Sequence, residues 1–127
     1  METNLNNIGS QQTQPNQIVA NLDMGKLLLN RAENVLSGAN VFPKNDKTGL
    51  YEKIQNECND LFRQSIPYFN SAIDIIDNLD EDAQSDNRTN LYNCLNSLST
   101  VYTRLEMYEE LKPIKKRIDE IIKTVDK

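Results

Sequence analysis

The sequence contains no histidine and no tryptophan, and it has only two cysteines in 127 residues. Without histidine the chain has no imidazole to act as a general base, to complete a Ser-His-Asp triad or to ligate zinc or haem. Its four glycines are not clustered, so they cannot build a phosphate-binding loop. These absences point away from catalysis and towards binding. We expect no catalytic residues and no cofactor.

Basic residues are in the minority, 14 against 19 acidic ones, which gives a net charge of -5 and a pI near 4.7. A nucleic-acid-binding domain normally carries a basic patch, because phosphate contacts dominate its affinity. The basic residues that do cluster, in residues 109–120, are interleaved with acidic ones: Lys112, Lys115, Lys116 and Arg117 among Glu109, Glu110, Asp119 and Glu120. This pattern is typical of a solvated helix face, so we expect no nucleic-acid partner.

Acidic residues gather in residues 74–86, which raises the question of a calcium site. An EF-hand loop starting at Asp80 would place Ser85 where glycine is needed and Leu91 where the closing glutamate is needed. The match fails, and we interpret the segment as an acidic loop between helices with no metal. Cys58 and Cys94 both fall on apolar stripes, which favours buried free thiols.

Long hydrophobic runs are also lacking: no stretch reaches the length of a membrane span, and the N-terminus has no apolar signal-peptide region. As written, the sequence predicts a cytoplasmic chain without membrane insertion, or a periplasmic one if it is excised from an exported protein. Asn87-Arg88-Thr89 matches a glycosylation sequon, a triplet that also occurs often by chance.

Apolar residues recur at helical spacing through most of the chain. Residues 1–16 are rich in Asn, Gln and Thr and predict a disordered segment. The first stripe runs from Ile18 to Ala39, and Gly38 and Pro43 mark its end. A second stripe runs from Tyr51 to Ile76 and keeps its phase across Pro67, which predicts one long helix, kinked near that proline. A polar loop is expected over 77–89.

Two further stripes complete the chain, one from Leu91 to Leu105 and one from Tyr108 to Val125. Only Glu106 and Met107 separate them, and so short a connection predicts an antiparallel pair of helices. No segment shows the two-residue alternation of a strand. The sequence therefore predicts an all-α fold of four helices arranged as antiparallel hairpins.

In the C-terminal hairpin, Leu95, Leu98-Ser99, Tyr102 and Leu105 recur at helical spacing. They stand at the spacings of the first helix of a tetratricopeptide repeat, with Ser99 in place of the usual glycine, so the hairpin resembles that family. The run Leu105-Glu106-Met107-Tyr108-Glu109-Glu110 is similar to the family's turn between helices, Leu-Gly followed by Tyr-Glu-Glu. The second helix departs from the pattern at Leu111 and Lys115, which suggests a terminal, capping helix.

The N-terminal pair resembles the same motif with an insertion. Pro15-Asn16 stands where a preceding repeat would end, Met24-Gly25 stands at the Leu-Gly pair, and Ser65, Phe69 and Ala72 stand at the Ala-x-x-x-Phe-x-x-Ala step. The small residues of this motif let two helices approach closely. The pattern looks like the long-helix variant found in bacterial multi-repeat proteins. The resemblance implies a fragment of a right-handed superhelix over 17–127, with an elongated first repeat at 17–79 and a terminal repeat at 88–126.

The resemblance implies a non-catalytic module for protein–protein interaction or scaffolding, with a protein or peptide partner on a concave face. That face would carry Val19, Leu22, Lys26 and Leu29 from the first helix and a ladder of Asn93, Asn96, Thr100 and Thr103 from the third. The alternative is a structural or self-associating four-helix bundle without a peptide groove. In that alternative an exposed edge of Ile18, Val19 and Leu22 contacts a second copy or the upstream repeats of a longer chain.

Overall fold

The computed structural model describes residues 2–39 and 47–125, with side chains for residues 16–38 and 47–124. In these ranges the chain forms five helices in the order α1 (Glu2–Ala39), α2 (Leu50–Asp77), α3 (Glu81–Asp86), α4 (Arg88–Arg104) and α5 (Tyr108–Val125). The described backbone contains no strand, so the all-α prediction is confirmed. The predicted number of four helices is corrected to five within these ranges, because the segment expected as a loop contains α3.

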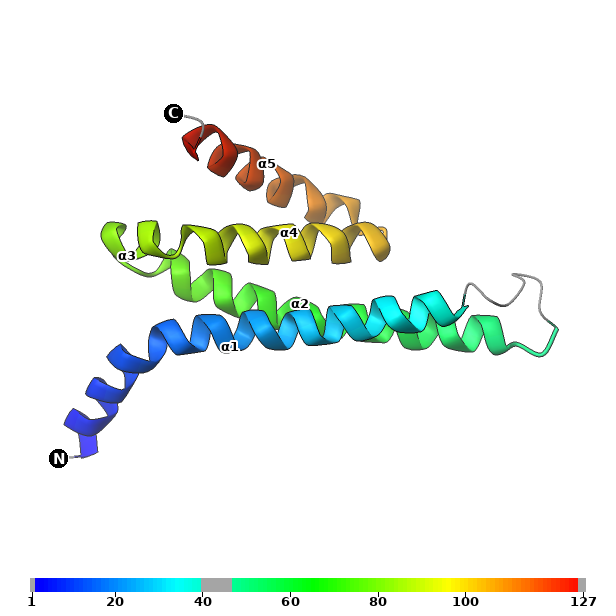
Figure 1. Ribbon diagram of the computed structural model, residues 1–127, viewed down its shortest axis with the longest axis horizontal. Helices are drawn as coiled ribbons and strands as arrows, with labels where there is room; N and C mark the ends of the chain where they lie inside the picture. The colour runs from blue at the N-terminus through cyan, green and yellow to red at the C-terminus, as the bar shows by residue number, and fades with distance from the viewer. Residues whose placement is uncertain (1, 40–46, 126–127) are drawn as a thin grey trace.

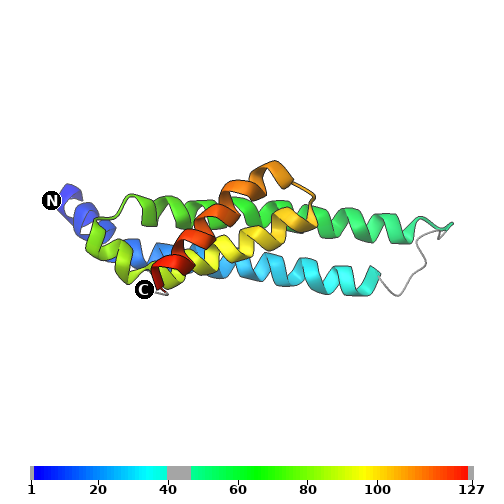
Figure 2. The ribbon, with the colours of Figure 1, turned by 90° about the horizontal axis from the view of Figure 1, so that it is seen from above.

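The helices pack in two tiers (Figure 1): α1 and α2 form the lower tier, and α4 and α5 form the upper tier. The long helices α1 and α2 lie side by side and antiparallel, and α4 packs on both of them. The backbone of α5 comes close only to α4 among the described helices, and Figure 2 shows α5 crossing over α4 at an angle. Of the four long helices described, α5 is therefore the least enclosed.

The start of α1 differs from the prediction. The backbone is helical from Glu2, where the sequence predicts disorder over 1–16 and a first helix from residue 17. Extending an existing helix costs little, and the glutamines at 11, 12 and 14 are adequate helix formers. The first part of α1 bends away from the rest in Figure 1, and Pro15, which has no N–H to donate inside a helix, supplies a physical reason. Pro43 and the predicted loop at 40–46 lie outside the described residues.

Helix α2 is continuous through Pro67, as the unbroken apolar phase predicts. Its chain enters through Gly49, whose φ of 77° is left-handed and suits a residue without Cβ. Ser65 is fully buried, and its hydroxyl donates to the carbonyl of Phe62 at 2.6 Å. The buried hydroxyl of Ser65 is therefore hydrogen-bonded within its own helix.

The short helix α3 forms because Asp80 caps it. The Asp80 side chain accepts a hydrogen bond from the N–H of Ala83 at 2.9 Å, and Glu81 and Asp82 follow in the first turn, where acidic side chains favour the helix dipole. Asn87 then ends α3 and begins α4: its side-chain Nδ2 donates to the carbonyl of Ala83 at 2.8 Å. The segment 77–89 is acidic, as expected, but it is not a simple loop.

The turn between α4 and α5 follows the Schellman pattern of helix ends. The N–H of Met107 donates to the carbonyl of Tyr102 at 2.8 Å, and the N–H of Glu106 donates to that of Thr103 at 3.2 Å. Glu106 has a φ of 59°, the left-handed conformation that glycine usually supplies at this position. This turn confirms the predicted short, antiparallel connection.

A single hydrophobic core joins α1, α2, α4 and the first turn of α5. It contains the ring of Phe69 against Gly25, and both cysteines are buried free thiols, as predicted. The buried residues of this cluster come from four helices: Leu22, Leu29, Ala32, Cys58, Phe62, Phe69, Ala72, Ile73, Cys94, Leu95, Leu98, Val101, Tyr102 and Leu111.

The α1–α2 pair extends well beyond α4 at the end where α2 begins (Figures 1 and 2). Beyond α4 the side chains of the pair are no longer fully buried: among the side chains described, the last buried residue of α1 is Ala32, although the helix continues to Ala39. Similarly, the first buried residue of α2 is Cys58, although the helix begins at Leu50. The molecule thus narrows from a packed bundle at one end to a two-helix arm at the other.

Candidate functional site

The structure corrects the predicted concave face on α1. Leu22 and Leu29 are only 4% and 8% exposed and belong to the core, so neither offers a free surface to a partner. Ile18 is fully buried as well, which removes it and Leu22 from the predicted self-association edge, whereas Val19 is 45% exposed. The physical reason is that α1 turns one apolar stripe towards both α2 and α4. Lys26 is exposed, as a binding residue must be.

The predicted polar ladder lies on the solvent side of α4. Successive helical residues are 100° apart, which places Asn93, Asn96, Thr100 and Thr103 opposite the buried stripe of Cys94, Leu95, Leu98, Val101 and Tyr102. Asn96 and Thr103 are exposed, and Asn93 and Thr100 are half-buried. The threonine hydroxyls are already engaged within α4, donating to the carbonyls of Asn96 at 3.3 Å and Ser99 at 2.7 Å respectively. The asparagine amides are therefore the main groups this face offers to a ligand.

The part of α1 that carries Lys26 lies next to α4. Burial raises the pKa of the Cys94 thiol to about 11, and the charge of nearby Lys26 opposes that rise. Further along the same two helices, Arg104 pairs with Glu33 at 3.6 Å. The structure therefore places Lys26 near Cys94, on the stripe of α4 opposite the polar ladder, while Leu22 and Leu29 lie beneath the surface.

A second surface lies where α3, α4 and α5 meet, and sequence reasoning did not single it out. Two cavities occur there, of about 200 and about 430 Å³. They share three lining residues, Arg88, Leu91 and Ile121, so they form one depression, which we call the terminal groove. Its other lining residues are Arg117, Glu120 and Thr124 from α5 and Glu81, Asp82, Gln84 and Ser85 from α3.

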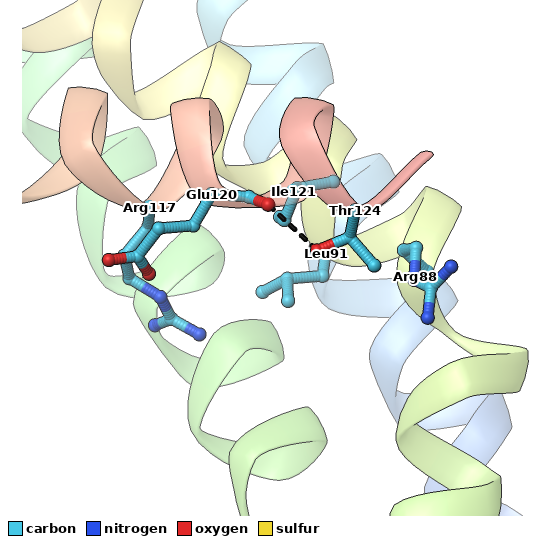
Figure 3. Close-up of a pocket in the computed structure, with 6 residues that line it drawn as sticks. All are labelled: Arg88, Leu91, Arg117, Glu120, Ile121 and Thr124. Atoms are coloured by element: carbon cyan, nitrogen blue, oxygen red, sulfur yellow. Dashed lines mark hydrogen bonds between the residues drawn. The ribbon is translucent and has the colours of Figure 1, made fainter. Parts of the chain in front are cut away.

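Figure 3 shows how the α4 and α5 side of the terminal groove is built. Leu91 and Ile121 lie between Arg117 on one side and Arg88 on the other, and the hydroxyl of Thr124 donates to the carbonyl of Glu120 at 2.9 Å. Leu91 and Ile121 are both half-buried and pack against the core. The groove therefore has an apolar floor and a charged rim.

The two arginines of the terminal groove differ in their contacts. Arg117 donates to both carboxylate oxygens of Asp77 in α2, at 2.9 and 3.2 Å, and this ion pair ties α5 to the lower tier. Arg88 forms no ion pair within the described residues, and neither do Glu81, Asp82 and Glu120. Apart from the Arg117–Asp77 pair, the rim thus carries three carboxylates against one guanidinium.

Both cysteines are buried free thiols whose pKa values are raised by burial. The thiol of Cys58 donates to the carbonyl of Ala32 at 3.1 Å, and burial raises its pKa. A raised pKa keeps a thiol protonated and therefore a poor nucleophile. In the described part of the chain, no three His, Cys, Asp or Glu side chains come together as metal ligands.

The sequon residue Asn87 has a structural role. Asn87 of the sequon is half-buried, with its amide nitrogen hydrogen-bonded to Ala83 and its amide oxygen accepting from Asn90 at 3.2 Å, so it acts as a structural cap between α3 and α4. Among the described residues, no helix combines the length and apolar composition that crossing a bilayer requires.

Comparison of the chain with protein-family models, with curated proteins and with solved structures found no match. The structure presents two candidate surfaces, the polar ladder of α4 and the terminal groove.

Proposed function

We propose that this protein is a non-catalytic scaffolding module that binds another protein through its upper tier, α4 and α5. The observation that carries the proposal is the incomplete coverage of α5. Its backbone approaches only α4, and Leu111 is its only fully buried residue among those described. Ile114, Ile118 and Ile121 remain half-buried, and Tyr108 and Ile122 are exposed. Apolar side chains left partly uncovered along one helix are typical of a surface that receives a partner.

We propose further that α1–α2 and α4–α5 are two degenerate repeats of the tetratricopeptide type. The spacings quoted above for both hairpins support this, and so does the contact between Gly25 and Phe69, which the resemblance assigns to a small and an aromatic position. In such arrays each pair of helices covers the one before it, and the last pair is covered by a cap or by a partner. The uncovered apolar residues of α5 fit that place in an array.

Site-specific photo-crosslinking tests the proposed function. A photoreactive amino acid at Ile122 of α5 is compared with one at Asn56, an exposed position on the two-helix arm. We expect Ile122 to capture a discrete protein in native extract and Asn56 to capture none. No product from Ile122, or the same products from both positions, would contradict the proposal.

The alternative, a self-associating bundle, is favoured by one separate observation. Val19, Met24 and Leu27 of α1 are 45%, 41% and 47% exposed, which leaves apolar side chains on the side of α1 away from its buried stripe. Light scattering coupled to size-exclusion chromatography separates the two functions. A monomer favours a module that awaits a partner, whereas a stable dimer that Leu27→Asp dissociates favours self-association.

A further inference from the structure

The terminal groove has a shape suited to a helix. Its two cavities join at Arg88, Leu91 and Ile121, so the depression runs from Thr124 of α5 across the start of α4 to Glu81 of α3. Leu91 and Ile121 form an apolar floor at the junction. A depression that is bounded by three helices and has an apolar floor fits the helix-in-groove mode of recognition, in which apolar side chains anchor an amphipathic helix.

The charges around this floor indicate which helix fits. Arg117 is neutralised by Asp77, at 2.9 Å, and contributes no free charge to a ligand. Glu81, Asp82 and Glu120 form no ion pair in the described residues, and only Arg88 opposes them. A ligand helix therefore gains most when basic residues flank its apolar anchor, because such residues meet the unpaired carboxylates on the rim.

The same charges argue against a second copy of this chain as the occupant. The whole protein carries a net charge of -5, so two copies repel each other at long range, and the acidic rim adds to that repulsion. A partner of opposite charge is instead attracted to the groove.

We propose that the terminal groove binds an amphipathic helix of a partner protein, with an apolar anchor on Leu91 and Ile121 and lysine or arginine on either side. This proposal rests on the proposed function and adds the chemistry of the partner. The carboxylates of Glu81 and Asp82 are the groups that select a basic helix over an acidic one.

Three synthetic helical peptides of about 18 residues test the selection, a length at which an isolated helix is stable enough to use. They share one leucine stripe and differ only in the flanking positions, which are all lysine, all glutamine or all glutamate. Each is titrated into the full-length, ¹⁵N-labelled protein. We expect the lysine peptide to bind most tightly and to shift the amide signals of Arg88, Leu91 and Ile121. We expect the glutamine peptide to bind about tenfold more weakly and the glutamate peptide more weakly still.

A pair of double variants separates the groove from general attraction to an acidic protein. Glu81→Gln with Asp82→Gln removes two rim carboxylates, and Glu52→Gln with Glu57→Gln removes two exposed carboxylates from the far end of α2. The rim variant should weaken binding of the lysine peptide about tenfold, and the α2 variant less than about twofold. Both are exposed substitutions, and amide spectra of the free variants check that the fold is retained.

Several outcomes overturn the proposal: equal weakening by both double variants, equal binding of the three peptides, or shifts located away from the groove. Failure of the peptides together with a crosslinked partner at Ile122 rejects the basic helix but leaves the proposed function standing. Failure of the peptides together with the absence of any crosslink rejects both.

Discussion

The ring of Phe69 in α2 lies against the backbone of Gly25 in α1, so closely that a Cβ at position 25 would fall 2.6 Å from Cε1 of the ring. Phe69 is fully buried, which leaves the ring no open space to move into. The two long helices therefore meet at this point with no room for a larger residue, and the contact fixes how near they lie.

Gly25→Ala should destabilise the protein. Alanine is favoured over glycine inside a helix by about 1 kcal/mol, but forcing a methyl group into a packed core costs about 1–3 kcal/mol. Because the ring cannot yield freely, we expect the steric cost to be in the upper part of that range, about 2–3 kcal/mol. The net loss in the free energy of unfolding is then about 1–2 kcal/mol, measured by urea denaturation. Gly38→Ala is the matched control: a Cβ there meets nothing within 4 Å, so that variant should be unchanged or up to about 1 kcal/mol more stable. A stabilised Gly25→Ala protein would show that the helices separate easily.

Glu106→Gly should stabilise the turn between α4 and α5. Glu106 has a φ of 59°, which costs a residue with a Cβ about 1 kcal/mol and costs glycine almost nothing. We expect a gain of about 0.5–1 kcal/mol by thermal or urea unfolding, reduced by the greater freedom of glycine in the unfolded chain. Glu110→Gly, within the first turn of α5, should instead lose about 1 kcal/mol. If both substitutions destabilise equally, the left-handed conformation of Glu106 is wrong.

Leu98→Ala should cost about 2–5 kcal/mol, since the side chain is fully buried among α1, α2 and α4 core residues and its removal leaves a cavity. Leu27→Ala removes the same atoms from a side chain that is 47% exposed and should cost less than about 1 kcal/mol. Chemical denaturation of the two variants measures the difference. If Leu98→Ala leaves stability nearly unchanged, the assignment of α4 to the core is wrong.

Asn96→Ala should leave stability within about 0.5 kcal/mol of the parent protein, because the side chain is exposed and Thr100 donates to the backbone carbonyl of Asn96 rather than to its amide. If the polar ladder of α4 contributes to partner binding, the same variant weakens capture of the crosslinked partner. Unfolding caused by this substitution would instead place Asn96 in the core.

Cys94 should make the protein sensitive to alkaline pH. Burial raises the pKa of its thiol to about 11, compared with 9.0 for an unburied thiol, so the fold favours the protonated form. The resulting stability is present in full below pH 9 and is lost as the pH rises from 9 towards 11, by up to about 3 kcal/mol. Cys94→Ala should flatten this part of the pH–stability curve relative to the parent. Identical slopes would indicate that the thiol ionises without cost.

Much of the fold could be predicted from the apolar periodicity. The stripe from Tyr51 to Ile76 gave α2 as one helix despite Pro67, and Glu106 and Met107 gave the tight turn before α5. Periodicity could not find α3, because its six residues bury nothing and depend on the Asp80 cap. It also could not assign 2–16, where helix extension from Ile18 outweighs a polar composition.

The candidate site was harder to predict because it depends on which neighbour each face meets. Leu22 and Leu29 were predicted to lie on a concave face, but α1 packs against both α2 and α4 and both side chains lie in the core. The terminal groove requires Leu91 and Ile121 to meet, and the Arg117–Asp77 pair spans 40 residues of sequence. Leu91 and Ile121 were visible as apolar positions and Arg117 as part of a basic cluster, but no spacing rule links residues so far apart.

The two-helix arm has a consequence for local stability. Backbone amides near Ala32 and Cys58 lie under a complete core, whereas those towards Ala39 and Leu50 are covered by one neighbouring helix only. Because opening of the arm exposes little apolar surface, its amides exchange with solvent through local fluctuations. The amides of the bundle exchange only when the whole protein unfolds. Hydrogen exchange should therefore be graded along single, unbroken helices: α1 should be slow between Ile18 and Ala32 and faster towards Ala39, and α2 should be slow from Cys58 onwards and faster towards Leu50.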